Sequence, residues 1–325
     1  MIVRNRLLVL WGLLAAACGQ AQAQAPTRVY VSNEKDHQIV VLDGQGQLLG
    51  RIPVCQRPRD MKFNPARTQI LVVCGDSNQL GWVDLAQQKL VGTLALADSP
   101  EMLALSGDGK TAYVSSEDDS ALIAYDLASK KQLFQVKTGG EPEGVQLMPD
   151  GRFVYVTSEV ANLVHRVDLQ QKKVVQNIKV GARPRRFSLS PDGKQLWVSN
   201  ELGASVSVID THSQQVLATV PFQIQGMRAS DITPVGLVHS PDGRSVWVSL
   251  GRANHVAEID TATRQVRRTV LVGKRAWGLA FNKSGSMLYV TNGLSDDLTL
   301  IDAAQGKALR SVSAGRVPHT VLVHD

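Results

Sequence analysis

A unit of about 42 residues occurs seven times along this chain and constrains its fold more than any other feature. Successive units are 41 or 42 residues apart, except for one step of 50. The core position of the unit falls at Tyr30, Val72, Tyr113, Tyr155, Trp197, Trp247 and Tyr289, and its aspartate at Asp43, Asp84, Asp126, Asp168, Asp210, Asp260 and Asp302. Short apolar alternations at this period, without helical runs, are typical of a propeller with four strands per blade. We therefore predict an all-β, seven-bladed β-propeller.

One unit, residues 184–220, shows how a blade is built. It contains four segments of strand length, rich in β-branched and aromatic side chains, at residues 187–190, 196–199, 206–210 and 216–220. The first two are joined by the turn Pro191-Asp192-Gly193, which recurs at 149–151 and 241–243. In this turn proline presets one backbone angle and glycine takes the conformation that other residues resist. These residues are predicted to be structural.

The two ends of the chain are predicted to share a blade. Val29–Val31 has the pattern of a second strand, whereas Thr320–Val323 has that of a first strand. The C-terminal strand should therefore complete the N-terminal blade and close the ring, which leaves no open sheet edge. Because no linker-like composition interrupts the units, residues 24–325 are predicted to be a single domain.

The first 23 residues are typical of a signal peptide. Two arginines precede the apolar run Leu7–Ala17, which is too short to span a bilayer, and Ala21-Gln22-Ala23 supplies small residues for cleavage. We expect an exported, periplasmic protein with no transmembrane segment in the mature chain. The alternative is a lipoprotein attached through Cys18, because residues 14–18 form a rough lipobox.

The charge of the chain excludes one class of partner. Removal of residues 1–23 takes away two arginines and lowers the net charge from +6 to +4. Lys and Arg are scattered through every unit, so the basic stripe that follows a phosphate backbone is missing from the sequence. We therefore expect no nucleic-acid partner.

Two sets of loop residues are expected to meet at the mouth of the central channel. In a propeller, the loop that leads into each inner strand shares one face with the loop between the second and third strands, and function collects on such loops. The first set consists of equivalent positions: Arg59, Glu101, Glu143, Arg185, Val235, Trp277 and His319. The second set contains five acids: Glu34, Asp76, Glu117, Glu159 and Glu201.

These loop residues allow two interpretations. In the first, they form a solvated rim whose acids and arginines pair with one another, each exposed pair contributing under about 1 kcal/mol. In the second, they form a polar pocket, where Arg59 and Arg185 hold the anionic group of a ligand in bidentate fashion and Trp277 supplies an aromatic wall.

The step of 50 residues places about eight additional residues within 223–231, on the same face. Met227 and Arg228 in this segment are candidates for a lid or a partner contact. The alternative is a tolerated surface insertion.

Two cysteines are expected near the same rim. Cys55 precedes the inner strand of the second blade, and Cys74 ends the neighbouring strand. A disulfide between them would suit an oxidising periplasm. Simple hairpin register separates them by a few residues, so the bonded and free states both remain open.

Most catalytic and cofactor motifs are absent from the sequence, including those for covalent haem, a serine nucleophile elbow and zinc. We therefore assign no cofactor. Only His319, with Glu101 and Glu143, forms a conceivable metal or acid–base cluster, and the identity of any metal is left open. Seven-bladed lactonases use acidic metal sites at this mouth, so a metal-dependent, lactonase-like hydrolase is the enzymatic alternative.

Several segments resemble known propeller repeats. Residues 155–157, 190–193 and 208–210 are similar to the YVTN-repeat propellers, a likeness that covers the whole mature chain. A narrower resemblance, to the propellers associated with pyrroloquinoline quinone (PQQ)-dependent catabolism, is carried by the segments 30–36, 57–59, 141–144, 183–185, 197–199, 234–236 and 291–293. It implies an exported bacterial protein found with a transport system and quinoprotein alcohol oxidation. PQQ is then the context of the pathway and is not assigned as a cofactor.

The expected function is therefore a supporting one. We expect a non-enzymatic propeller that binds a small molecule or a periplasmic protein, such as a quinoprotein dehydrogenase, a cytochrome or a transporter component. A purely structural protein-interaction platform is the further alternative, because the fold by itself does not define a function.

Overall fold

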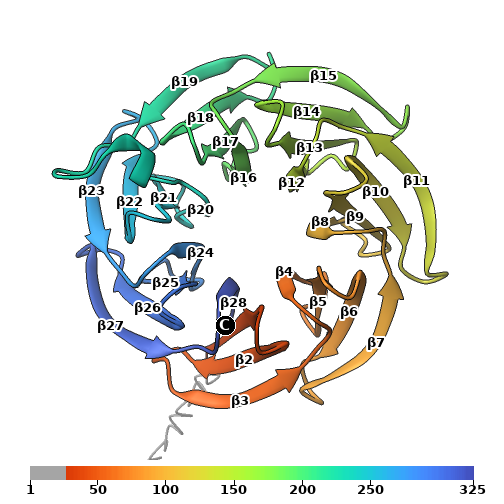
Figure 1. Ribbon diagram of the computed structural model, residues 1–325, viewed down its shortest axis with the longest axis horizontal. Helices are drawn as coiled ribbons and strands as arrows, with labels where there is room; N and C mark the ends of the chain where they lie inside the picture. Colours follow the sequence, from red (N-terminus) through yellow and green to blue (C-terminus); the bar gives the residue numbers. More distant parts are fainter. Residues whose placement is uncertain (1–26) are drawn as a thin grey trace, which may run out of the picture.

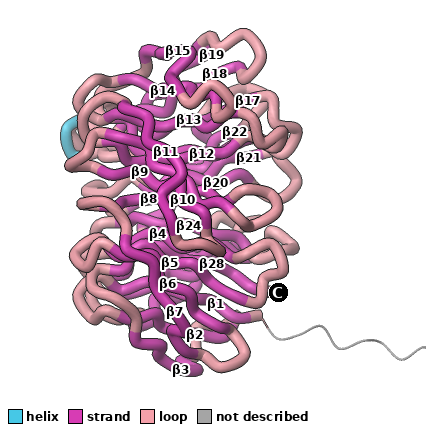
Figure 2. The backbone as a smooth tube through the Cα atoms, turned by 90° about the vertical axis from the view of Figure 1, so that its right-hand side faces the viewer, coloured by secondary structure: helices cyan, strands magenta, loops and turns pink. Residues whose placement is uncertain are grey.

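The computed structural model describes residues 27–325 and confirms the predicted fold. Seven antiparallel, four-stranded sheets are arranged in a ring around a central channel (Figure 1). Seen from the side, the strands form the body of the ring and loops cover its two faces (Figure 2). The predicted signal peptide, Cys18 included, lies outside the described residues. Within those residues, no helix is long and apolar enough to cross a membrane.

Each blade runs from an inner strand at the channel to an outer strand at the rim. The first four blades in chain order are β28 (Pro318–His324) with β1 (Arg28–Asn33), β2 (Gln38–Asp43) and β3 (Leu48–Pro53); β4 (Pro58–Phe63), β5 (Gln69–Cys74), β6 (Gln79–Asp84) and β7 (Lys89–Ala95); β8 (Pro100–Leu105), β9 (Thr111–Ser116), β10 (Ala121–Asp126) and β11 (Lys131–Lys137); and β12 (Pro142–Leu147), β13 (Phe153–Ser158), β14 (Leu163–Asp168) and β15 (Lys173–Lys179).

The remaining three blades follow the same order. They are β16 (Pro184–Leu189), β17 (Gln195–Asn200), β18 (Ser205–Asp210) and β19 (Val216–Pro221); β20 (Leu237–His239), β21 (Ser245–Ser249), β22 (His255–Asp260) and β23 (Val266–Leu271); and β24 (Ala276–Phe281), β25 (Met287–Asn292), β26 (Asp297–Asp302) and β27 (Lys307–Ser313). A single 3-10 turn, η1 (Ala229–Asp231), is the only helical element of the described residues.

The chain ends share the first blade, as predicted. Strand β28 pairs antiparallel with β1, and Tyr30 lies opposite Leu322. The C-terminus therefore supplies the inner strand of the blade whose other three strands come from the N-terminus.

The hydrophobic core lies between neighbouring blades. Because side chains alternate across a strand, both faces of a central strand such as β17 are available for packing. Trp197 is fully buried and packs in one cluster with Val246 and Val248 of the next blade. Each blade thus completes its core only against its neighbours, which is why the ring must close.

The register corrects one detail of the predicted repeat. Val72 pairs with Met61, the position that Val198 holds opposite Phe187 in β16 and β17. The residue of the second blade that corresponds to Trp197 is therefore Leu71, and not Val72. Leucine at this position hides the aromatic signal on which the alignment depended.

Candidate functional site

The first set of loop residues lies at a bulge where each inner strand begins. Pro184 of β16 pairs with Asn200, but the next pair is Phe187 with Val198, so Arg185 and Arg186 stand outside the regular ladder. The same shift occurs in β4, β8, β12, β24 and β28. A bulge releases side chains from strict alternation. Two successive residues per blade can therefore face the channel.

In six of the seven blades, a hydroxyl group of the preceding blade anchors the start of the inner strand. Thr157 Oγ1 donates to the Arg185 carbonyl (2.8 Å) and accepts from the Gly144 backbone N–H (2.7 Å). Equivalent bonds run from Ser32 to Arg59, Ser115 to Glu143, Ser199 to Val235, Ser249 to Trp277 and Thr291 to His319. This role was missed from the sequence, although Ser or Thr stands two residues after the aromatic in six of the seven units.

Four residues of the first set form a continuous chain of ion pairs. Arg59 contacts Glu101 and lies 3.6 Å from Glu143, and Arg185 lies 3.1 Å from Glu143 on its other side. These side chains are only 1–8% exposed. For these four residues the interpretation as an exposed, solvated rim is therefore wrong: the pairs exist, but they are enclosed by the protein.

Three acids of the second set join this network. Glu34 lies 3.4 Å from Arg59, Glu159 contacts Arg185, and Glu201 lies 3.5 Å from Arg185. Arg59 and Arg185 therefore each have three carboxylate neighbours. Such a buried network is specific in geometry, because removal of one member leaves its partner charged and unpaired.

The other two acids of the second set stay at the surface. Asp76 is half exposed and lies 3.6 Å from Arg57. Glu117 accepts a hydrogen bond from Ser99 (3.4 Å). Neither contacts the buried network directly.

The network sets the protonation of its carboxyl groups. Burial would raise the pKa of Glu143, but Arg185 and Arg59 outweigh it and lower that pKa to about 2. Burial raises the pKa of Glu101 to about 8 against the opposing effect of Arg59, and it raises the pKa of Glu159 to about 8 against Arg185. Of these three carboxyl groups, Glu143 is thus the one whose ionised form the arginines favour most strongly.

His319 is held neutral. Burial lowers its pKa well below the ordinary value, and the neighbouring Arg186 adds to this effect. The neutral ring can accept a hydrogen bond at Nε2 from Arg186 (2.8 Å), while Nδ1 lies 3.0 Å from Thr320 Oγ1. The 3.8 Å approach of His319 to Glu34 is therefore not an ion pair.

A cavity of about 290 Å³ opens at the channel mouth, and Arg275, Trp277, Leu294 and His319 are part of its lining. The Arg275 guanidinium lies 4.9 Å from the centre of the Trp277 ring, a cation–π contact. Trp277 Nε1 is buried and has no hydrogen-bond partner within the protein. The cavity thus combines an aromatic wall with a cation.

The cation of this cavity is not one of the two predicted from the sequence. Arg59 and Arg185 line it, but carboxylates already surround their guanidinium groups. Arg275 has a single ion pair, 3.5 Å from Glu201, and its side chain is 24% exposed. Of the three arginines that line the cavity, Arg275 is therefore the one best placed to meet a ligand.

The proposed metal cluster does not fit the geometry. No group of three or more His, Cys, Asp or Glu side chains within residues 27–325 is arranged to hold a metal ion. Glu101 and Glu143 are both bound by Arg59, and His319 turns Nε2 toward Arg186. Guanidinium groups thus occupy the directions from which a metal would be bound.

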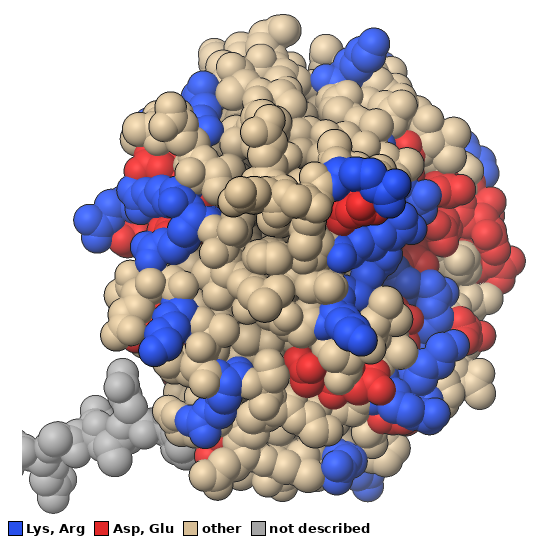
Figure 3. Space-filling model, turned by 60° about the vertical axis from the view of Figure 1, so that its left-hand side comes forward, with Lys and Arg blue, Asp and Glu red and all other residues tan. Residues whose placement is uncertain are grey.

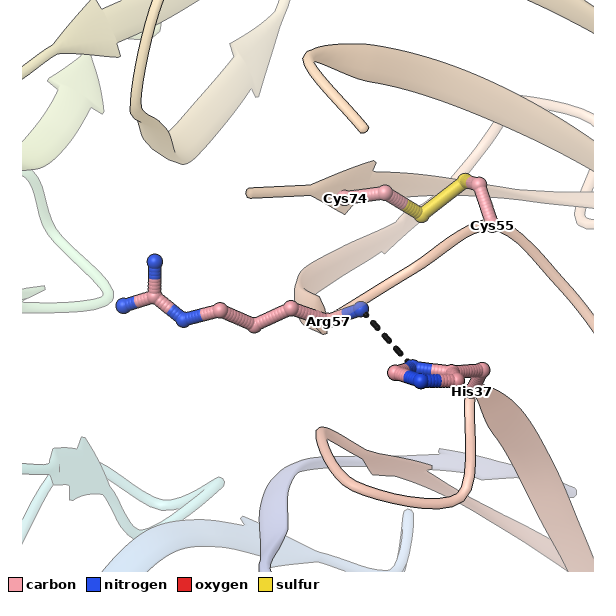
Figure 4. Close-up of a disulfide and its surroundings, with 4 residues drawn as sticks. All are labelled: His37, Cys55, Arg57 and Cys74. Atoms are coloured by element: carbon pink, nitrogen blue, oxygen red, sulfur yellow. Dashed lines mark hydrogen bonds between the residues drawn. A yellow bond between two sulfur atoms is a disulfide. The ribbon is translucent and has the colours of Figure 1, made fainter. Parts of the chain in front are cut away.

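Cys55 and Cys74 form a disulfide, with their Cα atoms 5.7 Å apart. Cys74 pairs with Pro58 in the sheet, and Arg57 has a left-handed backbone (φ 54°) that turns the preceding loop back toward it. The Arg57 backbone N–H also donates to His37 Nδ1 (3.1 Å), and its side chain extends away from the disulfide (Figure 4). Arg57 lies 3.4 Å from Glu101, so the disulfide holds a loop that serves the network.

The inserted segment does not cover the mouth. Met227 and Arg228 are exposed and do not line the cavity. Arg228 pairs with Asp231 of η1 (3.1 Å), which lies away from the central opening (Figure 1).

Charge is unevenly distributed on the mouth face. The four mouth-face loops at residues 75–78, 96–99, 117–120 and 138–141 hold six acids and no basic residue: Asp76, Asp98, Glu117, Asp118, Asp119 and Glu141. The loops from residue 180 to residue 275 carry most of the basic residues: Arg183, Arg228, Arg252, Lys274 and Arg275. Figure 3, in which this face lies to the right, shows basic and acidic side chains gathered in neighbouring areas. Arg275 and its cavity belong to the basic side.

The fold and this charged channel define a seven-bladed propeller with a built site at one mouth. Residues 39–234 match the YNCE-like beta-propeller family, and the chain belongs to that family. Residues 164–324 also match the seven-bladed beta-propeller lactonases.

The curated relatives are similar over a short region. The uncharacterized protein YncE of Salmonella typhimurium is 32% identical over 89 residues, and that of Salmonella typhi is 30% identical over 89 residues. Each match covers 27% of this chain and 25% of the relative, so the chain matches about a quarter of the length of these proteins.

Solved structures share the fold at low identity. Hydrazine synthase of Kuenenia stuttgartiensis superposes with a TM-score of 0.75 at 20% identity, covering 85% of this chain and 92% of that chain. A functionally unknown protein from Desulfotomaculum acetoxidans has a TM-score of 0.77 at 17% identity, covering 91% and 98%. Dihydro-heme d1 dehydrogenase NirN has a TM-score of 0.70 at 16% identity, covering 91% and 74%. These likenesses concern the architecture alone.

Proposed function

We propose that this chain is an exported, non-enzymatic propeller that binds a small organic acid at the mouth of its channel. One observation carries the proposal: the cavity of about 290 Å³ where Arg275 lies over Trp277. Its volume is near the lower end of ligand pockets, which suits a small molecule. Carboxylic acids are the end products of alcohol oxidation, the pathway that the PQQ-dependent resemblance suggests.

The contacts of Arg275 and Trp277 favour a carboxylate. Burial lowers the pKa of Arg275 despite its pairing with Glu201 at 3.5 Å, so its charge is incompletely compensated. A ligand carboxylate would compensate it through charge-assisted hydrogen bonds. The ring of Trp277 and the side chain of Leu294 would contact the apolar part of the ligand.

The proposed compartment is the periplasm. It is supported by the signal-peptide pattern of residues 1–23 and by the disulfide between Cys55 and Cys74, since disulfides persist in oxidising compartments. Attachment through Cys18 is the alternative. In this setting the propeller would support PQQ-dependent alcohol catabolism and its transport system, without holding PQQ itself.

Calorimetric titration of the mature protein with acetate, butyrate and benzoate tests the mouth site. We expect Arg275→Met and Trp277→Leu each to weaken binding about tenfold, the loss of roughly one charge-assisted or aromatic contact. Arg316→Met is the matched control, because Arg316 lies on the same face and pairs with Asp36 outside the cavity. Equal affinity in all variants would contradict the proposal of a ligand site at the mouth.

A protein partner is the second candidate function, and exposed apolar side chains favour it. Leu294, Val160 and Leu202 are 70, 66 and 60% exposed and hold equivalent places in three mouth-face loops. Such side chains gathered around a polar site are typical of interaction surfaces. Cross-linking of the wild-type protein to a purified quinoprotein dehydrogenase or cytochrome, lost in Leu202→Glu, would support a protein-interaction platform. A wild-type protein that cross-links to neither partner would oppose it.

A lactonase-like hydrolase is the third candidate, favoured only by the match of residues 164–324 to that family. The residues expected to hold its metal, Glu101, Glu143 and His319, are engaged by arginines. A melting temperature raised by calcium or zinc and restored by chelator would favour this function. No response to either ion would oppose it.

A further inference from the structure

A large cavity lies at the end of the channel opposite the mouth. Its volume is about 940 Å³, and it is lined by the last residues of the inner strands, together with the turns that follow them. We call it the vestibule. A second cavity of about 450 Å³ adjoins it and shares Lys62, Phe63, Met102, Gln146, Phe187 and Leu189 with its lining. The size is at the upper end of ligand pockets.

Aromatic side chains form much of the vestibule wall. Phe63, Phe187 and Phe281 come from three different blades, β4, β16 and β24, and each is only partly buried. Leu237 and Leu322 extend the same apolar surface. Contact with the apolar body of a ligand would remove these apolar side chains from water, which favours binding.

A buried cation with few partners lies at the vestibule floor. Arg186 is 6% exposed, lines the vestibule and has one carboxylate within reach, Glu143 at 3.7 Å. Arg59 and Arg185, by contrast, each have three carboxylate neighbours. Its other contacts are uncharged: the neutral His319 lies at 2.8 Å, and the centre of the Trp277 ring lies 5.6 Å from the guanidinium. Nε of Arg186 has no hydrogen-bond partner within the protein. Buried charges are normally paired, so Arg186 is short of an anion.

The other charges of the vestibule compensate Arg186 only in part: burial lowers the pKa of Arg186 and outweighs the opposing effect of Asp60, and Asp60 also pairs with Lys62. Asp60 lies 3.3 Å from Lys62 and accepts from the Leu103 N–H. Asp325 accepts from the backbone of Lys283, an exposed residue at the opening. Four basic and two acidic residues line the vestibule in all: Lys62, Arg67, Arg186 and Lys283 against Asp60 and Asp325. The excess is positive.

We propose that the vestibule is a second ligand site, which binds an organic anion with a flat aromatic body. The anionic group would meet Arg186 at the floor, and the body would lie against Phe187 and Phe281. The buried layer of Arg59, Glu143 and Arg185 lies between this site and the mouth cavity. The proposal stands on residues of its own and does not depend on the mouth site.

A matched pair of fluorescent probes tests it. 1-Anilinonaphthalene-8-sulfonate carries an aromatic body and one anionic group, and N-phenyl-1-naphthylamine has the same body without the sulfonate. We expect the wild-type protein to bind one sulfonate probe per chain, about tenfold more tightly than the neutral probe. Arg186→Met should abolish this difference while leaving the affinity for the neutral probe unchanged.

Two further variants complete the test. Lys283→Glu changes an exposed side chain and should weaken binding of the sulfonate probe about threefold without affecting the fold. If Arg186→Met does not fold, Lys283→Glu alone tests the vestibule site. Arg275→Met at the mouth should leave both probes unaffected. Equal affinity for the two probes in the wild-type protein, or no change in Arg186→Met and Lys283→Glu, would overturn the vestibule site while leaving the mouth site untouched.

Discussion

Replacement of Glu143 by glutamine should lower the free energy of unfolding by about 3 kcal/mol at neutral pH. The carboxylate is buried and lies 3.1, 3.6 and 3.7 Å from Arg185, Arg59 and Arg186. Its pKa of about 2, in place of the ordinary 4.5, corresponds to about 3 kcal/mol. Loss of one member of a buried pair typically costs about 3–5 kcal/mol, so the two figures agree.

The sign of the pH dependence follows from the depressed pKa. The contribution of Glu143 is fully present above pH 4.5, the ordinary pKa, and is lost as the pH falls through about 2. The wild-type advantage over Glu143→Gln should therefore be largest near neutral pH and should shrink on acidification.

Urea unfolding and thermal melting of the two proteins measure this difference. We expect the melting temperature of Glu143→Gln to fall by roughly 5–10 °C. Glu141→Gln is the matched control, because Glu141 is 46% exposed and lies 3.8 Å from Arg183, so its loss should cost under about 1 kcal/mol. If Glu143→Gln were as mild as Glu141→Gln, Glu143 would not be the ionised centre of the network.

Three further predictions concern closure, the disulfide and pH. Deletion of Pro318–Asp325 should cause unfolding or aggregation, because it removes β28 from the first blade; an unchanged melting temperature would contradict this closure. Cys55→Ser should lower stability by roughly 3 kcal/mol, and titration of the unfolded, unreduced wild-type protein should find neither Cys55 nor Cys74 as a free thiol. Because the pKa of Glu159 is raised to about 8, its protonated form stabilises the fold below pH 4.5, and this contribution is lost as the pH rises through 8. The melting temperature of the wild-type protein should therefore fall as the pH rises through 8, and Glu159→Gln should reduce this fall. Identical pH profiles of the two proteins would argue against a proton held by Glu159.

The architecture could be predicted from the sequence because every unit repeats the same pattern of turn and strand residues. Turns such as Pro191-Asp192-Gly193 and strand residues such as Trp197 recur at a fixed period, and neighbouring blades must bury the same faces. The exception is instructive. Leu71 stands where other blades carry an aromatic residue, so the alignment slipped by one position there, and only the strand register reveals the slip.

The site was harder to predict because position does not determine burial. The repeat brought Arg59, Glu143 and Arg185 to equivalent places, but the bulge that turns them into the channel depends on hydrogen bonds between blades. Which arginines are saturated with carboxylates is a property of the closed ring. For the same reason the sequence did not single out Arg275 at the mouth or Arg186 at the vestibule floor.

The central claim is that the channel mouth binds a small organic acid. A thermal-shift comparison of the wild-type protein and Trp277→Leu tests it most directly, with one carbon skeleton supplied as alcohol, aldehyde and acid, and with PQQ, haem and divalent metals beside them. We predict that the acid raises the melting temperature of the wild-type protein and has no such effect on Trp277→Leu. A wild-type protein that responds to none of these compounds, or only to the alcohol or a metal, would contradict the claim.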